Sequence, residues 1–399
     1  MPWRESSVSE QRKAFIGKYL HGGERNLSEL CREFGISRKC GYKWIERFET
    51  GGIAGLEDQS RRPKHFRDAV SGDVVCEIVK IRDWKETWGG RKIRSYLLSQ
   101  GIKQIPCART IDRILKRCGF VTSTPASSKR KQGKYNVIQP EACNDVWTLD
   151  MKGWWTTLNA RRCDPLTIRD EHTRYILCLA ALERGVFETV KEQFQETFIR
   201  YGLPLYIRSD NGSPFASAKG YMGLTRLAVW FLKQDICPNR IAPASPYMNG
   251  AHERMHRDIK AELQKTPAQD ARAEQKRFDI WRAEYNRIRP HQSLNDQPPA
   301  KLYRSSKRKY KLVEEDFDYP QNFVLRKVSA NGEFNWRNTP IRFAKSLAGE
   351  KIALEFLSDQ TLRIWFRNYP LGITDVHCRK IQPAEQFEYV SFEPKEEYV

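Results

Sequence analysis

Three carboxylates far apart in the chain are the residues best suited to chemistry. Asp150 lies in VWTLDMKGWW, which alternates like a β-strand, and Asp210 ends the short apolar run PLYIRSD. Glu253 lies in AHERMHRDIKAEL, where apolar residues recur at every fourth position, as on one face of a helix. Carboxylates brought together repel unless cations neutralise them, and hard oxygen ligands suit Mg²⁺ or Mn²⁺. The set predicts a divalent-metal site if the fold makes the three converge.

The elements between these residues predict how they converge. After the strand of Asp150, the sequence predicts a hairpin turning at residues 171–173, a crossover helix ending at Gly202, and a parallel strand ending at Asp210. This order is typical of a mixed α/β sheet, in which functional groups collect beyond the C-terminal ends of adjacent strands. Lys260 comes two helical turns after Glu253 and is expected on the same helix face.

The same helix carries a competing motif. HERMH matches the zinc-protease pattern H-E-x-x-H at His252, Glu253 and His256. The longer metzincin pattern requires a glycine and a further histidine where this chain has Ile259 and Glu262. Glu274 is a possible downstream carboxylate ligand, but no motif around it supports that role. A zinc metalloprotease therefore remains a remote alternative.

Composition predicts the partner. The formal net charge is +20, and residues 1–140 carry 29 Lys and Arg against 15 Asp and Glu. Such a basic excess favours nucleic acid, because neutralising phosphates releases counterions. With no long apolar stretch and no signal-peptide pattern at the N-terminus, we expect a soluble, intracellular chain without a membrane partner. The ten cysteines include no C-x-x-C pair and are expected to be reduced and structural.

Two helical modules are predicted in the basic region. In NLSELCREFGISRKCGYKWIERFE, Asn26 and Ser37 can cap two helices and Gly35 can make the turn of a helix-turn-helix motif. The second helix carries the apolar residues Tyr42, Trp44, Ile45 and Phe48. Further helices are predicted at 72–83, 88–101 and 105–120, the last with Ile105, Ile111, Ile114 and Leu115 inward. The residues expected to contact DNA from the two modules are Arg38, Lys39 and Lys43, and Arg109, Arg113 and Lys116.

Beyond residue 320, short apolar runs separated by frequent turns predict a small C-terminal β-barrel, joined to the core through the basic connector SSKRKYK. The predicted organisation is therefore multidomain. Its parts are helix-turn-helix modules at 1–60 and 61–121, a basic linker at 122–140, an α/β core at 141–305 and a β-rich domain at 306–399.

These motifs together resemble a known family. Asp150 in WTLDMKG, Asp210 in IRSDNGSPF, and Glu253 with Lys260 in SPYMNGAHERMHRDIK look like the D-D-E integrase core of bacterial insertion-sequence transposases and retroviral integrases. The resemblance implies a ribonuclease H-like core whose three carboxylates hold two Mg²⁺ or Mn²⁺ ions. The 42 residues between Asp210 and Glu253 exceed the spacing in the shortest members, which predicts an insertion around residues 216–227.

The resemblance also implies an activity and partners. A member of this family would bind the terminal inverted repeats of a mobile element as double-stranded DNA, cleave phosphodiester bonds, and transfer the strand to target DNA. It would act as a dimer or larger homo-oligomer in the bacterial cytoplasm, associated with the nucleoid. Arg254, Arg257 and Lys260 would contact DNA beside the carboxylates. The alternative is a DNA-binding regulator whose integrase core is inactive.

Overall fold

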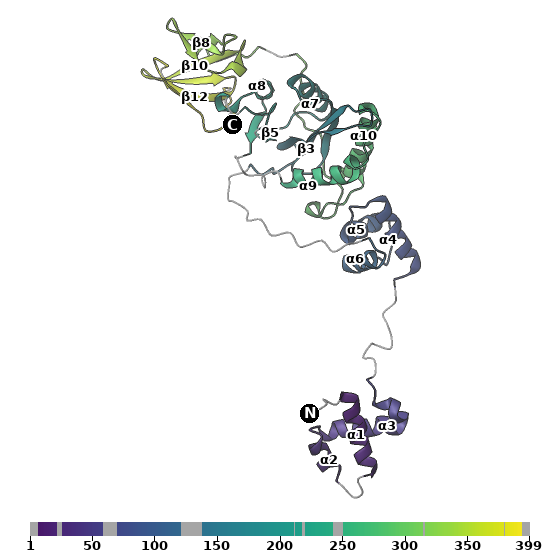
Figure 1. Ribbon diagram of the computed structural model, residues 1–399. Helices are drawn as coiled ribbons and strands as arrows, with labels where there is room; N and C mark the ends of the chain where they lie inside the picture. The colour runs from purple at the N-terminus through teal and green to yellow at the C-terminus, as the bar shows by residue number, and fades with distance from the viewer. Residues whose placement is uncertain are drawn as a thin grey trace, which may run out of the picture. The chain divides into compact units, whose positions relative to one another are not determined.

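The computed structural model describes residues 7–21, 26–58, 70–120, 138–210, 212–217, 220–241, 250–313, 316–378 and 380–392 (Figure 1). The chain divides into two compact units, Met1–Ala69 and Val70–Val399, and each is described by itself. Of the linker predicted at 122–140, only residues 138–140 lie within the described ranges.

The first unit is a small helical domain. Its helices are α1 (Val8–His21), α2 (Leu27–Glu33) and α3 (Arg38–Gly51), followed by a 3₁₀ turn at Gly52–Leu56. The side chain of Asn26 accepts a hydrogen bond from Ser28 N at 3.1 Å, and Ser37 Oγ accepts one from Cys40 N at 3.2 Å. Gly35 has φ +64° in the turn between α2 and α3, a conformation that favours glycine. The predicted helix-turn-helix layout is confirmed.

The apolar residues of α3 do not all lie in the core. Trp44 and Ile45 of α3 pack with Phe15 and Leu30 in the core of this unit, whereas Tyr42 is 55% exposed. Successive helix residues lie 100° apart, so a buried stripe at Gly41, Trp44 and Ile45 turns Tyr42 toward solvent.

The second unit begins with three helices that form their own apolar cluster. They are α4 (Gly72–Trp84), α5 (Gly90–Ser99) and α6 (Ala108–Arg117). Ile111, Ile114 and Leu115 of α6 are at most 1% exposed, as predicted, and pack against Ile78 and Ile93. The opposite face of α6 is therefore the basic one.

A mixed sheet forms the centre of the second unit. Its strands are β1 (Val146–Met151), β2 (Trp155–Thr156), β3 (Arg162–Asp170), β4 (Ile176–Leu182), β5 (Tyr206–Ser209) and β6 (Cys237–Arg240). The order is β2-β3-β1-β5-β6, with β4 also paired to β3. β1 runs antiparallel to β3 and parallel to β5, and β5 runs parallel to β6. The predicted hairpin, parallel strand and α/β class are confirmed.

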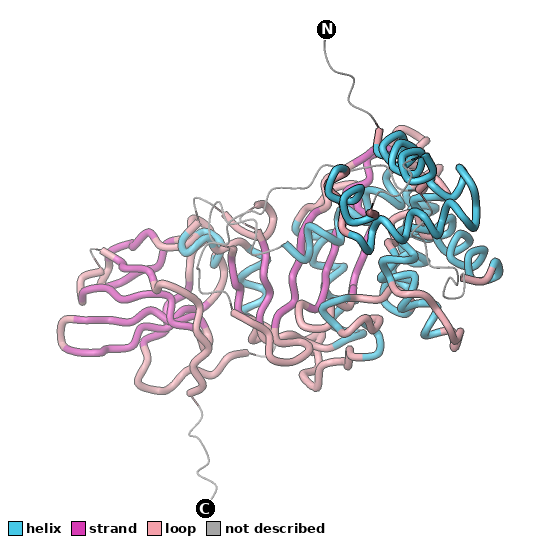
Figure 2. The backbone as a smooth tube through the Cα atoms, turned by 90° about the horizontal axis from the view of Figure 1, so that it is seen from below, coloured by secondary structure: helices cyan, strands magenta, loops and turns pink. Residues whose placement is uncertain are grey.

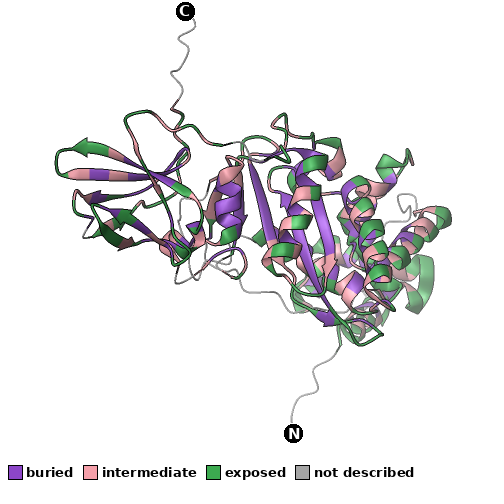
Figure 3. Cartoon of the chain, turned by 90° about the horizontal axis from the view of Figure 1, so that it is seen from above, coloured by how far each residue is buried: buried purple, intermediate pink, exposed green. Residues whose placement is uncertain are grey.

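Helices cover both faces of this sheet, so its central strands are buried (Figure 3). The helices are α7 (Phe187–Tyr201), α8 (Arg226–Lys233), α9 (Gly250–Ile259) and α10 (Ala271–Arg287), with a π-helical stretch at Lys260–Gln264. Trp147 and Leu149 of β1 share a core with α7 and α8, whereas Ile176 and Leu179 of β4 pack against α9 and α10. Single 3₁₀ turns lie at Tyr221–Gly223, Gln292–Leu294, Pro299–Lys301 and Lys345–Leu347. Across the described ranges, every helix is too short or too polar to cross a bilayer.

The predicted C-terminal β-barrel is wrong, because the C-terminal sheet is open (Figure 2). Its strands are β7 (Val324–Lys327), β10 (Lys351–Ser358), β11 (Thr361–Phe366), β12 (Tyr369–Asp375) and β13 (Ile381–Pro383), in the order β13-β12-β11-β10-β7. A separate hairpin pairs β8 (Glu333–Trp336) with β9 (Thr339–Arg342). Phe334 and Trp336 of this hairpin share a core with Leu362 of the sheet and with Val229 and Leu232 of α8. Because the hairpin and α8 cover the apolar face, the sheet buries it without closing.

The basic connector between the two sheets is docked on the central region. Ser306 N donates to Tyr201 O, and Leu203 N donates to Arg308 O, both at 2.8 Å. The Arg308 guanidinium donates to the carbonyls of Gln234 and Asp235 just beyond α8, at 3.1 and 2.7 Å. Carbonyls near a helix C-terminus have no partner within the helix, so a cation that binds them stabilises that end.

Candidate active site

The parallel pairing of β1 and β5 brings Asp150 and Asp210 together. Thr148 of β1 is in register with Arg208 of β5, and continuing both chains by two residues sets Asp150 beside Asp210. Parallel neighbours lie about 4.8 Å apart across a sheet. Asp150 is half-buried near the end of its strand, and Asp210 is exposed directly after β5, where its Oδ1 accepts a hydrogen bond from Gly212 N at 3.1 Å.

The charge of Glu253, on α9, also acts on the Asp150 carboxylate. Burial raises the pKa of Asp150 to about 7, and the negative charges of Asp210 and then Glu253 contribute to the rise. A hydrogen bond from the Met151 amide acts in the opposite direction and lowers this pKa. Asp210 and Glu253 therefore both act on Asp150 electrostatically, although the three residues lie on different elements. A divalent cation bound at Asp150 would favour the ionised form that its neighbours disfavour.

Two lysines stand beside this acidic cluster. Lys152 follows Asp150 by two residues, and burial and the charge of Lys260 both lower its pKa. Lys260 lies where α9 gives way to the π-helical stretch, so the regular helical spacing expected from Glu253 ends at this residue. Such π-helical turns occur frequently at functional sites.

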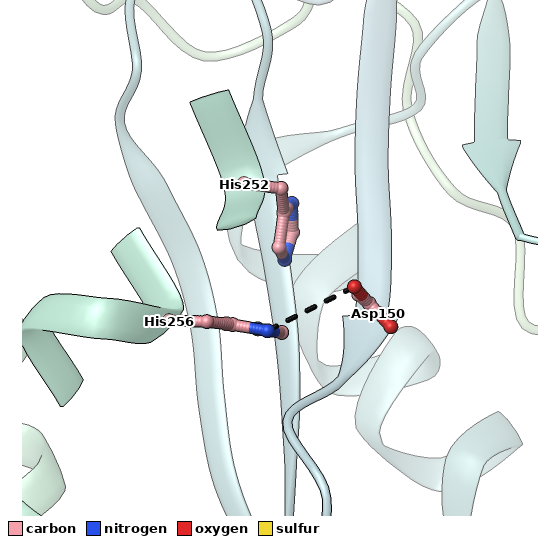
Figure 4. Close-up of side chains that lie close together, drawn as sticks. All are labelled: Asp150, His252 and His256. Carbon is pink, nitrogen blue, oxygen red and sulfur yellow. Dashed lines mark ion pairs between the residues drawn. The ribbon is translucent and has the colours of Figure 1, made fainter. Parts of the chain in front are cut away.

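Both histidines of HERMH point from α9 toward β1 (Figure 4). His252 is fully buried, with its Nδ1 at 3.1 Å from Thr148 Oγ1 and its Nε2 at 2.6 Å from Thr167 Oγ1. His256 Nε2 lies 2.9 Å from the same Thr167 hydroxyl, which also contacts the backbone carbonyl of Asp150 at 2.9 Å. The two Nε2 atoms therefore converge on a threonine hydroxyl, where a zinc protease would hold its metal. The arrangement disfavours the metalloprotease.

The other nitrogen of His256 faces Asp150. His256 Nδ1 lies 3.8 Å from Asp150 Oδ2, and one ligand atom each from Asp150, His252 and His256 lie within 4.8 Å of one another. Burial, then the charges of Lys152 and Arg169, lower the pKa of His256 to about 3. The imidazole is therefore neutral at neutral pH, and its contact with Asp150 is not an ion pair.

Removing the Thr167 hydroxyl is expected to destabilise this network. In Thr167→Val, His252 and His256 lose their shared partner within a buried site, and an unsatisfied buried polar group costs about 1–3 kcal/mol. We expect the free energy of unfolding to fall by about 2 kcal/mol, measured by urea denaturation. Thr167→Ser keeps the hydroxyl and is the matched control, with an expected loss under about 1 kcal/mol. Equal losses in the two variants would contradict a role for the hydroxyl.

The basic residues predicted to contact DNA are all exposed. Three lie on α3, three on α6 and three on α9 or directly after it: Arg38, Lys39 and Lys43; Arg109, Arg113 and Lys116; Arg254, Arg257 and Lys260. The last set shares its helix with Glu253, so it is the one adjoining the carboxylates.

Three residues of the site were missed in the sequence. Thr148 and Thr167 hold the histidines, and Lys152 adjoins Asp150. Lys152 could have been found, because it follows Asp150 by only two residues. Thr167 could not, since its place follows from its pairing with Asp150 across two strands.

Known families match three parts of the chain. A helix-turn-helix domain matches residues 11–64, a homeodomain-like domain matches residues 40–115, and an integrase core domain matches residues 234–299. The insertion element IS476 uncharacterized 39.2 kDa protein of Xanthomonas euvesicatoria is 28% identical over 261 residues, which is 63% of this chain and 70% of that protein. The insertion element IS407 uncharacterized 31.7 kDa protein of Burkholderia multivorans is 22% identical over 288 residues, 69% of this chain and 91% of that protein.

Solved structures give weaker likenesses. The HTLV-2 integrase catalytic core domain in complex with magnesium (trimeric form) is 12% identical with a TM-score of 0.31, covering 42% of this chain and 100% of that one. A chain of the simian T-cell lymphotropic virus intasome in complex with PP2A regulatory subunit B56 gamma is 12% identical with a TM-score of 0.35. The match covers 79% of this chain and 99% of that one. At scores this low the assignment rests on the sequence matches. Through its matches to helix-turn-helix domains, an integrase core domain and insertion-element proteins, the chain is similar to insertion-sequence transposases of the integrase superfamily.

Proposed function

We propose that this chain is a DNA transposase that binds the terminal inverted repeats of a mobile element, cleaves phosphodiester bonds at its ends and transfers the strands to target DNA. The observation that supports the proposal is the parallel pairing of β1 with β5, which brings Asp150 and Asp210 to one edge of the sheet, with Glu253 of α9 near enough for its charge to raise the pKa of Asp150. We propose these three carboxylates as the catalytic metal ligands.

The donor set fits two Mg²⁺ or Mn²⁺ ions. Oxygen ligands are what these hard cations prefer, and Asp150 is a carboxyl whose ionisation its neighbours oppose, which a cation would reverse. Bound ions would supply Lewis-acid activation of water and then of a 3′-hydroxyl. The chain's own contribution is to hold the carboxylates on rigid strands and a helix, with Lys152 and Lys260 available to bind a DNA phosphate at the rim.

DNA would be held by several basic surfaces. The exposed residues of α3 and α6 would bind the inverted repeats, and Arg254, Arg257 and Lys260 would bind DNA near the carboxylates. Handling two element ends requires at least two copies of the site, so we propose a homo-oligomer acting on DNA in the nucleoid.

The test is metal-dependent nicking of a duplex carrying an inverted-repeat end. We expect the natural protein to nick this DNA with Mg²⁺ or Mn²⁺, and Asp210→Asn and Glu253→Gln to bind it without cleavage. The exposed acid Glu188 supplies the control, Glu188→Gln, which should cleave normally. If the natural protein binds the DNA but proves as inert as the variants, the proposal fails and a DNA-binding regulator with an inactive core is the better description.

The contribution of α3 has its own expected outcome. Replacing Arg38, Lys39 and Lys43 together by Ala should weaken binding to inverted-repeat DNA and reduce the slope of log K against log salt by about 2 to 3, because each phosphate contact contributes about 0.9. Fluorescence anisotropy over a salt series measures both. Lys13→Ala removes an exposed charge from α1 and should change the slope by at most about 1. An unchanged slope in the triple variant would exclude α3 from the DNA surface.

A further inference from the structure

His256 is the one ring of the HERMH pair with an accessible path to the carboxylates. Its side chain is 12% exposed and that of Asp150 22%, whereas His252 is fully enclosed and has both ring nitrogens in contact with threonine hydroxyls. Although His252 lies within the same cluster, a ligand role would require it to abandon Thr167. His256 can reach an ion with Nδ1 while Nε2 keeps its contact with Thr167.

The hydroxyl of Thr167 constrains the tautomer of His256. This oxygen has one proton to donate and three acceptors around it: the Asp150 carbonyl and the Nε2 atoms of His252 and His256. If the proton goes to Asp150 or to His252, then His256 Nε2 must carry the hydrogen and donate to Thr167. Nδ1 of His256 is then an unprotonated lone pair directed at a carboxylate oxygen. Two facing acceptors repel, and a cation between them removes the conflict.

The distance allows one ion to bind both atoms. Bonds from a divalent transition metal to histidine nitrogen and to carboxylate oxygen are each about 2.1 Å, so the two ligand atoms can be at most about 4.2 Å apart. The separation between His256 Nδ1 and Asp150 Oδ2 is 3.8 Å, within that limit. A histidine whose second nitrogen is held by a neighbouring group is also the usual arrangement of a metal-binding imidazole.

We propose that His256 supplies a nitrogen ligand to one of the ions bound at Asp150, so that the site binds a transition ion such as Mn²⁺ more tightly than Mg²⁺. The inference rests on the proposed metal-dependent function and adds to it, because a site built from carboxylates alone offers only oxygen. Imidazole favours transition ions over Mg²⁺, for which oxygen ligands suffice.

The test detects the nitrogen directly on Mn²⁺-loaded full-length protein. Electron spin echo envelope modulation of the natural protein should show a ¹⁴N coupling that changes to the ¹⁵N pattern when histidine is ¹⁵N-labelled, which requires no variant. The coupling should vanish in His256→Asn and persist in the control His377→Asn, which alters an exposed turn of the C-terminal sheet. Calorimetry should give a Kd for Mn²⁺ about tenfold or more higher in His256→Asn, with the Kd for Mg²⁺ changed less than about threefold.

The contrary outcomes separate this inference from the proposed function. In one contrary outcome, the natural protein binds Mn²⁺ and Asp150→Asn does not, but the natural protein shows no histidine coupling. This result would overturn the role of His256 and leave the carboxylate site intact. A coupling that persists in His256→Asn would likewise overturn it, by assigning the nitrogen to another histidine. Failure of the natural protein to bind Mn²⁺ at all would overturn both proposals.

Discussion

Without metal at pH 8, the Asp150→Asn variant is expected to be more stable than the natural protein, although it should have lost cleavage activity. Loss of a metal-binding carboxylate removes several kcal/mol of transition-state stabilisation, so cleavage should fall by about 10³-fold or more. Stability should move the other way, because the amide that replaces the carboxylate would carry no buried negative charge beside Asp210.

The sign follows from the pKa of Asp150. Its value rises from 3.8 to about 7 on folding, so the folded state binds the proton more tightly than the unfolded state does. Between pH 4 and pH 7 the metal-free folded state therefore loses stability as pH rises, by up to about 4 kcal/mol once the pH exceeds 7. Asp150→Asn removes this loss, so its advantage should be present at pH 8 and absent at pH 4.

Thermal unfolding at the two pH values, with and without Mg²⁺, measures the effect. The ion should raise the unfolding temperature of the natural protein at pH 8 and leave Asp150→Asn unaffected, because ligands stabilise only the state that binds them. Asp359→Asn, in the exposed turn between β10 and β11, is the control and should behave like the natural protein. If the metal-free Asp150→Asn variant is less stable than the natural protein at pH 8, the ionised Asp150 carboxylate does not destabilise the folded state.

Phe198→Ala should give the largest loss of stability. Phe198 is fully buried on α7, and its ring lies 5.8 Å from Trp147 of β1, 5.5 Å from Phe194 and 5.5 Å from Trp230 of α8. Truncating a buried Phe to Ala costs about 3–5 kcal/mol, because the cavity does not fully collapse. Since Trp147 belongs to the strand of Asp150, the variant should also weaken metal binding.

Urea denaturation followed by tryptophan fluorescence tests this expectation. Ile199→Ala, at the next position on α7, removes a side chain that is 62% exposed and should change stability by less than about 0.5 kcal/mol. Comparable losses in the two variants would mean that α7 does not anchor the sheet through Phe198.

The sequence predicts those features that depend on neighbours along the chain. Asn26 and Ser37 cap helices through amides two or three residues away, and Gly202 ends α7 with φ +77°. The meeting of Asp150 with Asp210 was also predictable, because a crossover helix between two strands leaves few ways to pair them.

The features that escaped prediction depend on contacts between distant elements. Thr167 lies opposite Asp150 only because β3 pairs with β1 in one register, and shifting that register by a single residue would turn its hydroxyl to the other face. The open form of the C-terminal sheet could not be predicted for the same reason. Val229 and Leu232 of α8, about a hundred residues before this sheet, cover the apolar face that a closed barrel would have buried.

Because α8 covers the apolar face of the C-terminal sheet, it limits which fragments of the protein can be produced separately. A recombinant fragment ending at residue 313 would leave Ala228, Val229 and Leu232 without the sheet that buries them, next to the last strand of the central sheet. Such a fragment should be prone to aggregation, since an uncovered apolar face of this kind drives association. For expression, crystallisation or the exchange of parts between related proteins, we expect the central and C-terminal sheets to be needed together, within the unit that begins at Val70.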